Sequence, residues 1–139
     1  MIILDTNVLA ALMRATPDPE VIRWLDHQPR TSVWTTAITV FEIRFGLRIM
    51  AAGKKQMLLQ EAFEKLMDNL LEQRILQFDG PAALEAADLM VERQKKGSSG
   101  ELRDTMIAGI ALARHATLAT RNTRHFEGVS CPVVNPWDS

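Results

Sequence analysis

The segment IILDTNVL, residues 2–9, decides the fold because a buried strand, a polar turn and a helix start follow one another directly. Ile2 to Leu4 form a short apolar run without alternation, which is typical of a strand covered on both faces. Asp5 ends this run, and Asn7 to about Met13 has the spacing of a short helix. A strand that leads directly into a helix is the alternation expected of an α/β protein.

The same alternation continues along the rest of the chain. Short apolar runs predict further strands at 33–35, 75–78, 117–119 and 133–134. Longer stretches with a period of 3.6 residues predict helices at about 17–28, 36–49, 53–73, 81–96 and 98–115. Together they predict a mostly parallel central sheet with helices on both faces, in a single domain that spans residues 1–139.

Two of these helices carry start signals, and one of them has a marked apolar stripe. Thr36 is expected to cap the helix at 36–49, and Ser98 with Glu101 has the spacing of a capping box that opens the helix at 98–115. The helix at 36–49 is expected to bury a stripe toward the core, and the stripe consists of Ile38, Phe41, Phe45 and Ile49.

Composition excludes several classes of protein. The 139 residues are 47% hydrophobic and 24% charged, which is ordinary for a globular domain and excludes disordered and coiled-coil proteins. A single cysteine, Cys131, excludes a disulfide framework. No apolar run reaches the ~18 residues of a membrane span, and Asp5 interrupts the opening run too early for a signal peptide. We therefore expect a cytoplasmic protein with no membrane association, and the net charge of −1 indicates no general attraction to nucleic acid.

Polar residues at strand ends mark the expected site. In a parallel sheet, ligands bind at the carboxyl ends of the strands. Asp5 lies at the end of the first strand, and Asn122 lies just beyond the strand at 117–119. Glu42 and Asp104 are acids with apolar neighbours at helical spacing, so both are expected to point inward from their helices.

Three inward carboxylates near one point would repel one another, and a shared divalent cation would compensate them. Oxygen ligands without His or Cys favour Mg²⁺ or Mn²⁺ over zinc, and such ions typically support phosphoryl chemistry. Each acid alone also has a structural interpretation. Asp5 can cap a helix, Glu42 can pair with an arginine, and Asp104 can be a helix-start acid favoured by the dipole.

At these residues the sequence resembles a known family. ILDTNVL at 3–9, TAITVFEIRFG at 36–46, DTMIA at 104–108 and LATRNTRHF at 118–126 resemble the four motifs of PIN domains, in the family's order and spacing. The ending VNPW at 134–137 is similar to the FitB-like branch of the VapC proteins. The resemblance covers essentially the whole chain.

The resemblance implies a three-layer α/β/α PIN-like fold and an Mg²⁺-dependent endoribonuclease, with Mn²⁺ as a substitute. It also implies the toxin of a type II VapBC toxin–antitoxin module, with RNA as substrate, a cognate VapB-type antitoxin as partner, and a homodimer. Asp5, Glu42 and Asp104 become the expected metal ligands. Thr6 and Thr120 become groups that position ligands or water.

One position departs from the family pattern, because Asn122 stands where many members have an acid. An amide keeps an oxygen acceptor but carries no charge, so we expect a weaker second metal position rather than an inactive site. Arg121 and Arg124 border the acidic residues, and contact with the RNA backbone is one interpretation beside surface ion pairs. Two other functions stay open from the sequence, a non-catalytic PIN-like RNA-binding or scaffold protein and a metal-dependent phosphatase.

Overall fold

The strand predicted at residues 2–4 lies in the middle of the sheet. In the computed structural model, which describes residues 1–98 and 100–138, β1 (Ile2–Leu4) pairs in parallel with β2 (Val33–Thr36) and with β4 (Thr117–Ala119). β3 (Ile75–Leu76) lies beyond β2, and β5 (Val133–Val134) lies beyond β4. The strand order is therefore β3-β2-β1-β4-β5, with parallel pairing throughout, which confirms the predicted parallel sheet.

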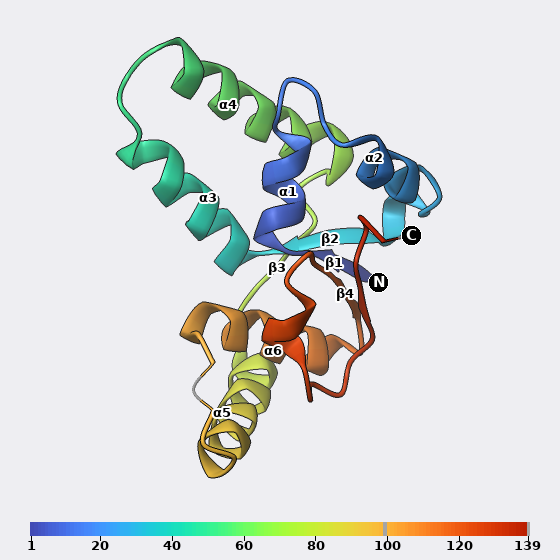
Figure 1. Cartoon of the computed structure of the whole chain (residues 1–139), viewed down its shortest axis with the longest axis vertical. Coiled ribbons are helices and arrows are strands. Elements are labelled where there is room, and N and C mark those ends of the chain that lie inside the picture. Colours follow the sequence, from blue (N-terminus) through green and yellow to red (C-terminus); the bar gives the residue numbers. More distant parts are fainter. Residues whose placement is uncertain (99, 139) are drawn as a thin grey trace.

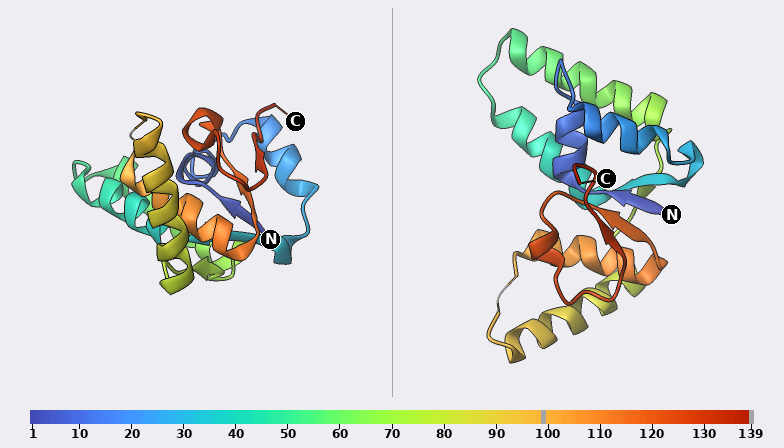
Figure 2. Two further views of the ribbon diagram at one scale, coloured as in Figure 1. Left: turned by 90° about the horizontal axis from the view of Figure 1, so that it is seen from below. Right: turned by 45° about the vertical axis from the view of Figure 1, so that its right-hand side comes forward.

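Helices cover both faces of this sheet and give three layers (Figure 1). One face carries α1 (Thr6–Leu12), α2 (Pro19–Asp26), α3 (Ala37–Ile49) and α4 (Lys54–Lys65). The other face carries α5 (Gly80–Lys95) and α6 (Leu102–Arg114). Figure 2 shows α5 and α6 packed side by side, and its right-hand view places them on the side of the sheet opposite α1–α4. Among the described residues, no helix is both long and apolar enough to cross a lipid bilayer.

The central strand explains why its apolar run does not alternate. Ile3 and Leu4 are both fully buried, and they belong to different hydrophobic clusters on opposite faces of the sheet. Leu4 packs with residues of the α1–α4 layer such as Val8 and Phe63, whereas Ile3 packs with residues of the α5–α6 layer such as Ile107. Successive side chains of a strand point to opposite faces, so both must be apolar when both faces are covered.

The start signals predicted for two helices have different outcomes. Thr36 caps α3, because its hydroxyl accepts a hydrogen bond from the backbone N–H of Thr39 at 3.1 Å. The capping box of Ser98 and Glu101 is wrong, since α6 begins at Leu102 with Glu101 as the N-cap. Glu101 therefore stands at the N-cap and not at the third helical position that a capping box needs, and its carboxylate pairs with Arg103 in the first turn at 2.8 Å. The helix predicted at 53–73 is α4 followed by a π-helical turn, Leu66–Leu70.

Of the apolar stripe predicted on α3, Ile38 packs partly buried against the core, but the prediction is wrong for the other three residues. Phe41, Phe45 and Ile49 are 57%, 53% and 68% exposed. Ile43 and Leu47, on another side of the helix, pack into the core instead. Periodicity locates an apolar face but does not say what covers it, and in this chain the two phenylalanines stack on each other at the surface.

Candidate active site

Asp5 is held rigidly at the carboxyl end of β1. It is the N-cap of α1, and one carboxylate oxygen, Oδ1, accepts the backbone N–H of Thr6 at 2.8 Å. The other oxygen, Oδ2, accepts the hydroxyl of Thr120 at 2.7 Å and the side-chain amide of Asn7 at 3.2 Å. Asp5 is only 4% exposed, and this burial raises its pKa although the three hydrogen bonds oppose the rise. Asp5 therefore combines its capping role with the inward position predicted for a ligand.

Thr120 connects the ends of β1 and β4 from behind the site. Its side chain is fully buried, and its hydroxyl donates to Asp5 while accepting from the Asn7 amide and from the backbone N–H of Asn122, both at 3.1 Å. Asn7 in turn accepts the backbone N–H of Arg121 at 2.9 Å. The turn after β4 is thus fastened to the turn after β1.

Glu42 reaches the same place from α3. Its Oε1 accepts the hydroxyl of Thr6 at 3.0 Å, and its Oε2 lies 3.7 Å from Nη1 of Arg103. Burial raises the pKa of Glu42, and the negative charges of Asp5 and Glu101 add to that rise. The predicted inward orientation is correct even though the phenylalanine beside it faces outward.

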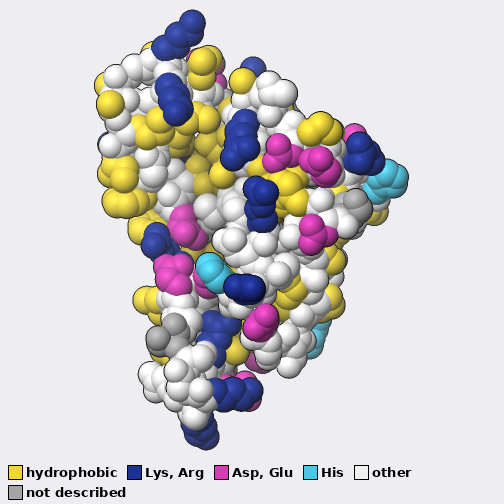
Figure 3. Space-filling view, viewed as in Figure 1, with side chains coloured by type: hydrophobic (Ala, Val, Ile, Leu, Met, Phe, Trp, Pro, Cys, Tyr) yellow, Lys and Arg dark blue, Asp and Glu magenta, His cyan; other side chains and the backbone are white. Residues whose placement is uncertain are grey.

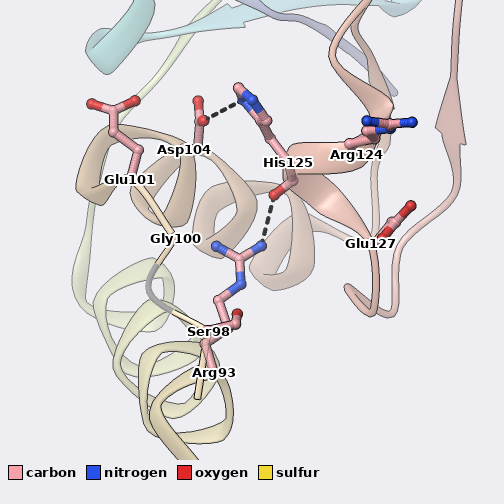
Figure 4. Close-up of a pocket in the computed structure, with 8 residues that line it drawn as sticks. All are labelled: Arg93, Ser98, Gly100, Glu101, Asp104, Arg124, His125 and Glu127. Atoms are coloured by element: carbon pink, nitrogen blue, oxygen red, sulfur yellow. Dashed lines mark hydrogen bonds and ion pairs between the residues drawn. The ribbon is translucent and has the colours of Figure 1, made fainter. Parts of the chain in front are cut away.

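Asp104 approaches from the first turn of α6. Its Oδ2 lies 2.9 Å from Nδ1 of His125, which belongs to the short 3₁₀ helix Thr123–Phe126 (Figure 4). Burial is the main influence that raises the pKa of Asp104, the charge of Glu101 adds to it, and the contact with His125 opposes it. This carboxylate therefore has a basic neighbour that the sequence analysis did not identify.

These side chains line one cavity of about 250 Å³ at the carboxyl edge of the sheet. Its walls hold the three carboxylates of Asp5, Glu42 and Asp104, and the remaining lining residues are Thr6, Asn7, Glu101, Asn122 and His125. The structure thus brings together the three predicted ligands with Thr6 and Asn122, while Thr120 supports them from behind.

The two predicted RNA-contacting arginines lie outside this cavity. The guanidinium carbon of Arg121 stands 4.7 Å from the ring centroid of Trp137. Arg124 lines a neighbouring cavity of about 440 Å³, which shares Glu101, Asp104 and His125 with the first one. Arginine stacks well on aromatic faces, so Arg121 is fixed by the C-terminal segment.

The donor chemistry of the cavity suits a hard divalent cation, because oxygen donors predominate in it: carboxylates, two side-chain amides and a hydroxyl, beside the single imidazole of His125. The three pKa values are raised, which shows that each negative charge lacks full compensation in the protein alone. Within residues 1–98 and 100–138, however, no three His, Cys, Asp or Glu side chains already stand where they could hold one ion together. Arg103 and His125 draw Glu42 and Asp104 to themselves.

The PIN domain family matches residues 2–130. The chain belongs to the PIN-domain family. This PIN domain is 40% identical to VapC ribonuclease Y4jK of Sinorhizobium fredii (99% of each chain covered) and 37% identical to toxin FitB of Neisseria gonorrhoeae (99% of each). Its fold superposes on the solved structure of FitAB bound to a DNA fragment with a TM-score of 0.88 at 37% identity, over 99% of this chain and 96% of that one.

These relationships place this PIN domain among the VapC proteins and confirm the predicted three-layer fold. Sequence reasoning had not selected His125 or Arg103. A signal was present, because His125 follows Asn122 by three residues at a strand end and Arg103 adjoins Asp104. Neither signal says which acid the side chain contacts, since that contact joins different elements.

Proposed function

We propose that this VapC protein is a divalent-cation-dependent endoribonuclease that acts as the toxin of a toxin–antitoxin pair. The observation that carries the proposal is that carboxylates from β1, α3 and α6 line a single cavity. A negatively charged cavity by itself repels RNA, so a site of this kind needs a cation between its acids and a phosphate. The relationship to a VapC ribonuclease supports RNA as the substrate.

Asp5, Glu42 and Asp104 would hold the ion, Mg²⁺ or Mn²⁺, with the amide oxygen of Asn122 near it. A bound ion of this kind polarises a phosphodiester and lowers the pKa of a water molecule that attacks it. To hold the ion, Glu42 would exchange its contact with Arg103, and Asp104 its contact with His125, for the cation. His125 would then be available to the negatively charged substrate, whereas Arg103 would stay paired with Glu101.

The other residues of the cavity fix the ligands. Asp5 accepts from Thr6, Asn7 and Thr120, and these three donors fix the orientation of its carboxylate. The hydroxyl of Thr6 also orients Glu42. A ligand set that is held in place loses little freedom when substrate arrives, which is a general source of catalytic advantage.

Near-isosteric substitutions test the function directly. Asp5→Asn, Glu42→Gln and Asp104→Asn each remove one charge and keep the shape, so each should lower RNA cleavage by at least ~100-fold, which corresponds to ~2.7 kcal/mol. Cleavage of purified tRNA and rRNA is followed with Mg²⁺, with Mn²⁺ and with EDTA. EDTA should abolish cleavage by the wild type.

Other outcomes would identify the alternatives. Robust cleavage by Asp5→Asn, or cleavage that persists in EDTA, contradicts the proposed mechanism. Binding of RNA without cleavage under any of these conditions favours a non-catalytic RNA-binding protein. Hydrolysis of p-nitrophenyl phosphate in place of RNA favours a phosphatase.

The proposed protein partner is an antitoxin, which fits an apolar groove on the α1–α4 layer. This groove has a volume of about 710 Å³, and its floor includes Met13, Leu58 and Leu59. Figure 3 shows hydrophobic side chains gathered over α3 and α4, with isolated basic groups around them. Three basic residues line the groove as well, namely Arg14, Lys54 and Lys55. An antitoxin segment with apolar and acidic side chains would complement both features.

A homodimer is part of the same proposal, on the relationship to the VapC family. Sedimentation velocity of the isolated protein tests it. A neighbouring reading frame that encodes a small protein with a DNA-binding N-terminus would support the antitoxin.

A further inference from the structure

The cavity beside the acidic site contains a fixed arginine that the proposed function has not yet used. Arg93, near the end of α5, donates from Nη1 to the hydroxyl of Thr105 at 3.1 Å and from Nη2 to the backbone carbonyl of His125 at 2.8 Å. Figure 4 shows its guanidinium directed from α5 toward Asp104 and His125. A guanidinium has five N–H groups, so these contacts with described residues leave three for a ligand.

The position of Arg93 depends on the absence of a side chain at Gly100. A Cβ built on Gly100 would overlap Nη1 of Arg93, so any other residue would displace the guanidinium. Thr105 strengthens the arrangement, because its hydroxyl accepts from Arg93 and donates to the backbone carbonyl of Glu101 at 3.1 Å. Arg93 is therefore held by parts of α5, α6 and the 3₁₀ helix at once.

We propose that Arg93, with Arg124, binds a backbone phosphate of the RNA strand next to the phosphate that is cleaved. This inference rests on the proposed endoribonuclease function and names residues that hold its substrate. The two arginines line one cavity of about 440 Å³, which adjoins the acidic cavity through Glu101, Asp104 and His125. An RNA strand with one phosphate in the acidic cavity must continue into an adjoining cavity. The cavity of about 440 Å³ carries two guanidinium groups, which recognise phosphate well.

The carboxylates around this cavity do not prevent phosphate binding. Glu101 is already paired with Arg103, and Asp104 with His125 or, in the loaded enzyme, with the cation. The Glu127 side chain points away from Arg93 (Figure 4).

The wall chemistry also favours RNA over a protein partner. The described residues that line this cavity are charged or polar or are glycine, whereas the groove on the α1–α4 layer is lined by Met13, Leu58 and Leu59. A cavity without apolar side chains has little to offer the hydrophobic core of a protein interface.

Three variants separate a fixed phosphate site from general electrostatic attraction. Arg93→Gln removes the proposed contact. Lys95→Gln removes the same charge from an exposed residue of α5 that does not line the cavity. Gly100→Ala keeps every charge and only displaces the guanidinium.

Binding is measured by fluorescence anisotropy with a fluorescein-labelled single-stranded RNA oligonucleotide, in EDTA so that no cleavage occurs, over a range of NaCl concentrations. Arg93→Gln should weaken binding about ten-fold at low salt, because it loses a charge-assisted hydrogen bond. It should also reduce the slope of log K against log salt by about 0.7, the value for one phosphate contact on a single strand. Gly100→Ala should weaken binding in the same direction, and Lys95→Gln should bind almost as the wild type does.

Several results would overturn the inference. Equal effects of Arg93→Gln and Lys95→Gln indicate general attraction, and wild-type binding by a folded Gly100→Ala excludes a positioned contact. Competition by inorganic phosphate as strong as that by RNA would indicate a free-phosphate site, and a loss of antitoxin binding alone would indicate a protein contact. Circular dichroism melting checks that each variant is folded.

Cleavage assays with Mg²⁺ keep the two proposals apart. If the wild type cleaves RNA and Arg93→Gln binds and cleaves equally well, only the phosphate site is wrong. If the wild type neither binds nor cleaves RNA, both proposals are wrong. The phosphate site predicts a higher KM for Arg93→Gln with a smaller change in kcat.

Discussion

The hydroxyl of Thr120 is the donor that lies nearest to Asp5, at 2.7 Å, and it is completely buried. Thr120→Val keeps the shape and removes this donor, so it leaves the buried carboxylate with one partner fewer. We expect a loss of ~1–3 kcal/mol in the free energy of unfolding together with reduced cleavage. Urea unfolding and the RNA cleavage assay measure the two effects. Thr120→Ser restores the hydroxyl and should recover most of both.

The pKa of Glu42 gives the protein a specific dependence of stability on pH. Burial raises this pKa in the folded state above its value in the unfolded chain, where it is about 4.3. A raised carboxyl pKa contributes stability at low pH, and that contribution is lost as pH rises through the folded-state value. Glu42→Gln has no charge to bury, and its amide oxygen can still accept from Thr6.

In EDTA, Glu42→Gln should therefore melt close to the wild type at about pH 4 and above it at neutral pH. The difference in melting temperature should grow as the pH rises through the folded-state pKa of Glu42. Calorimetry across this range measures it. A difference that stays constant with pH would show that the carboxylate is compensated within the protein, so that no cation is needed.

At the scale of residues, the sequence predicted the positions that depend on local pattern. Asp5 follows a buried strand, and Glu42 and Asp104 sit at helical spacing from apolar neighbours, so their convergence followed from the expected topology. The partners Arg103 and His125 could not be predicted in the same way. Each contact joins two different elements, and its geometry depends on how those elements pack.

At the scale of elements, α5 and α6 touch so closely that one residue must lack a side chain. A Cβ on Gly109 of α6 would lie 2.6 Å from the backbone oxygen of Ala82 and 2.7 Å from Cβ of Ala86. Helix propensity alone would make Gly109→Ala more stable by ~1 kcal/mol. Overpacking against a backbone atom opposes this and costs ~1–3 kcal/mol or more.

We therefore expect Gly109→Ala to lower the urea midpoint. Gly46→Ala is the matched control, because Gly46 lies in α3 and a Cβ there meets no atom within 4 Å. That control should gain ~0.5–1 kcal/mol. If both variants gain stability, the two helices can separate to make room.

The elements themselves were largely predictable, because strands and helices have different hydrophobic periods and this chain changes period sharply. The stripe of α3 was assigned to the core because an exposed apolar face and a buried one have the same period. The amino-acid sequence of a helix does not indicate whether another element covers its apolar face. That distinction requires the whole molecule, in which Ile43 and Leu47 already fill the core on another side of the helix.

At the scale of the whole molecule, the apolar groove makes a prediction about association. Leu58→Glu removes an apolar contact and places in the groove an acidic side chain that competes with the acidic groups of the antitoxin for Arg14, Lys54 and Lys55, so it should weaken binding of the antitoxin at least ten-fold, or by ~1.4 kcal/mol. Leu84→Glu is the control, because Leu84 is exposed on α5 in the opposite layer. Isothermal titration calorimetry compares the two variants. Equal affinities of the two variants would indicate that the antitoxin binds another surface.

The central position of β1 has a consequence for folding during synthesis of the chain. Thr120, which holds Asp5, lies 115 positions after it in the chain and is therefore synthesised much later. Contacts between such distant segments form late, because the loop between them must close first. The segment that forms the α1–α4 layer is therefore synthesised before β4, the strand that places Thr120 in the site. The site is therefore complete only after Thr120 has been synthesised and β4 has paired with β1.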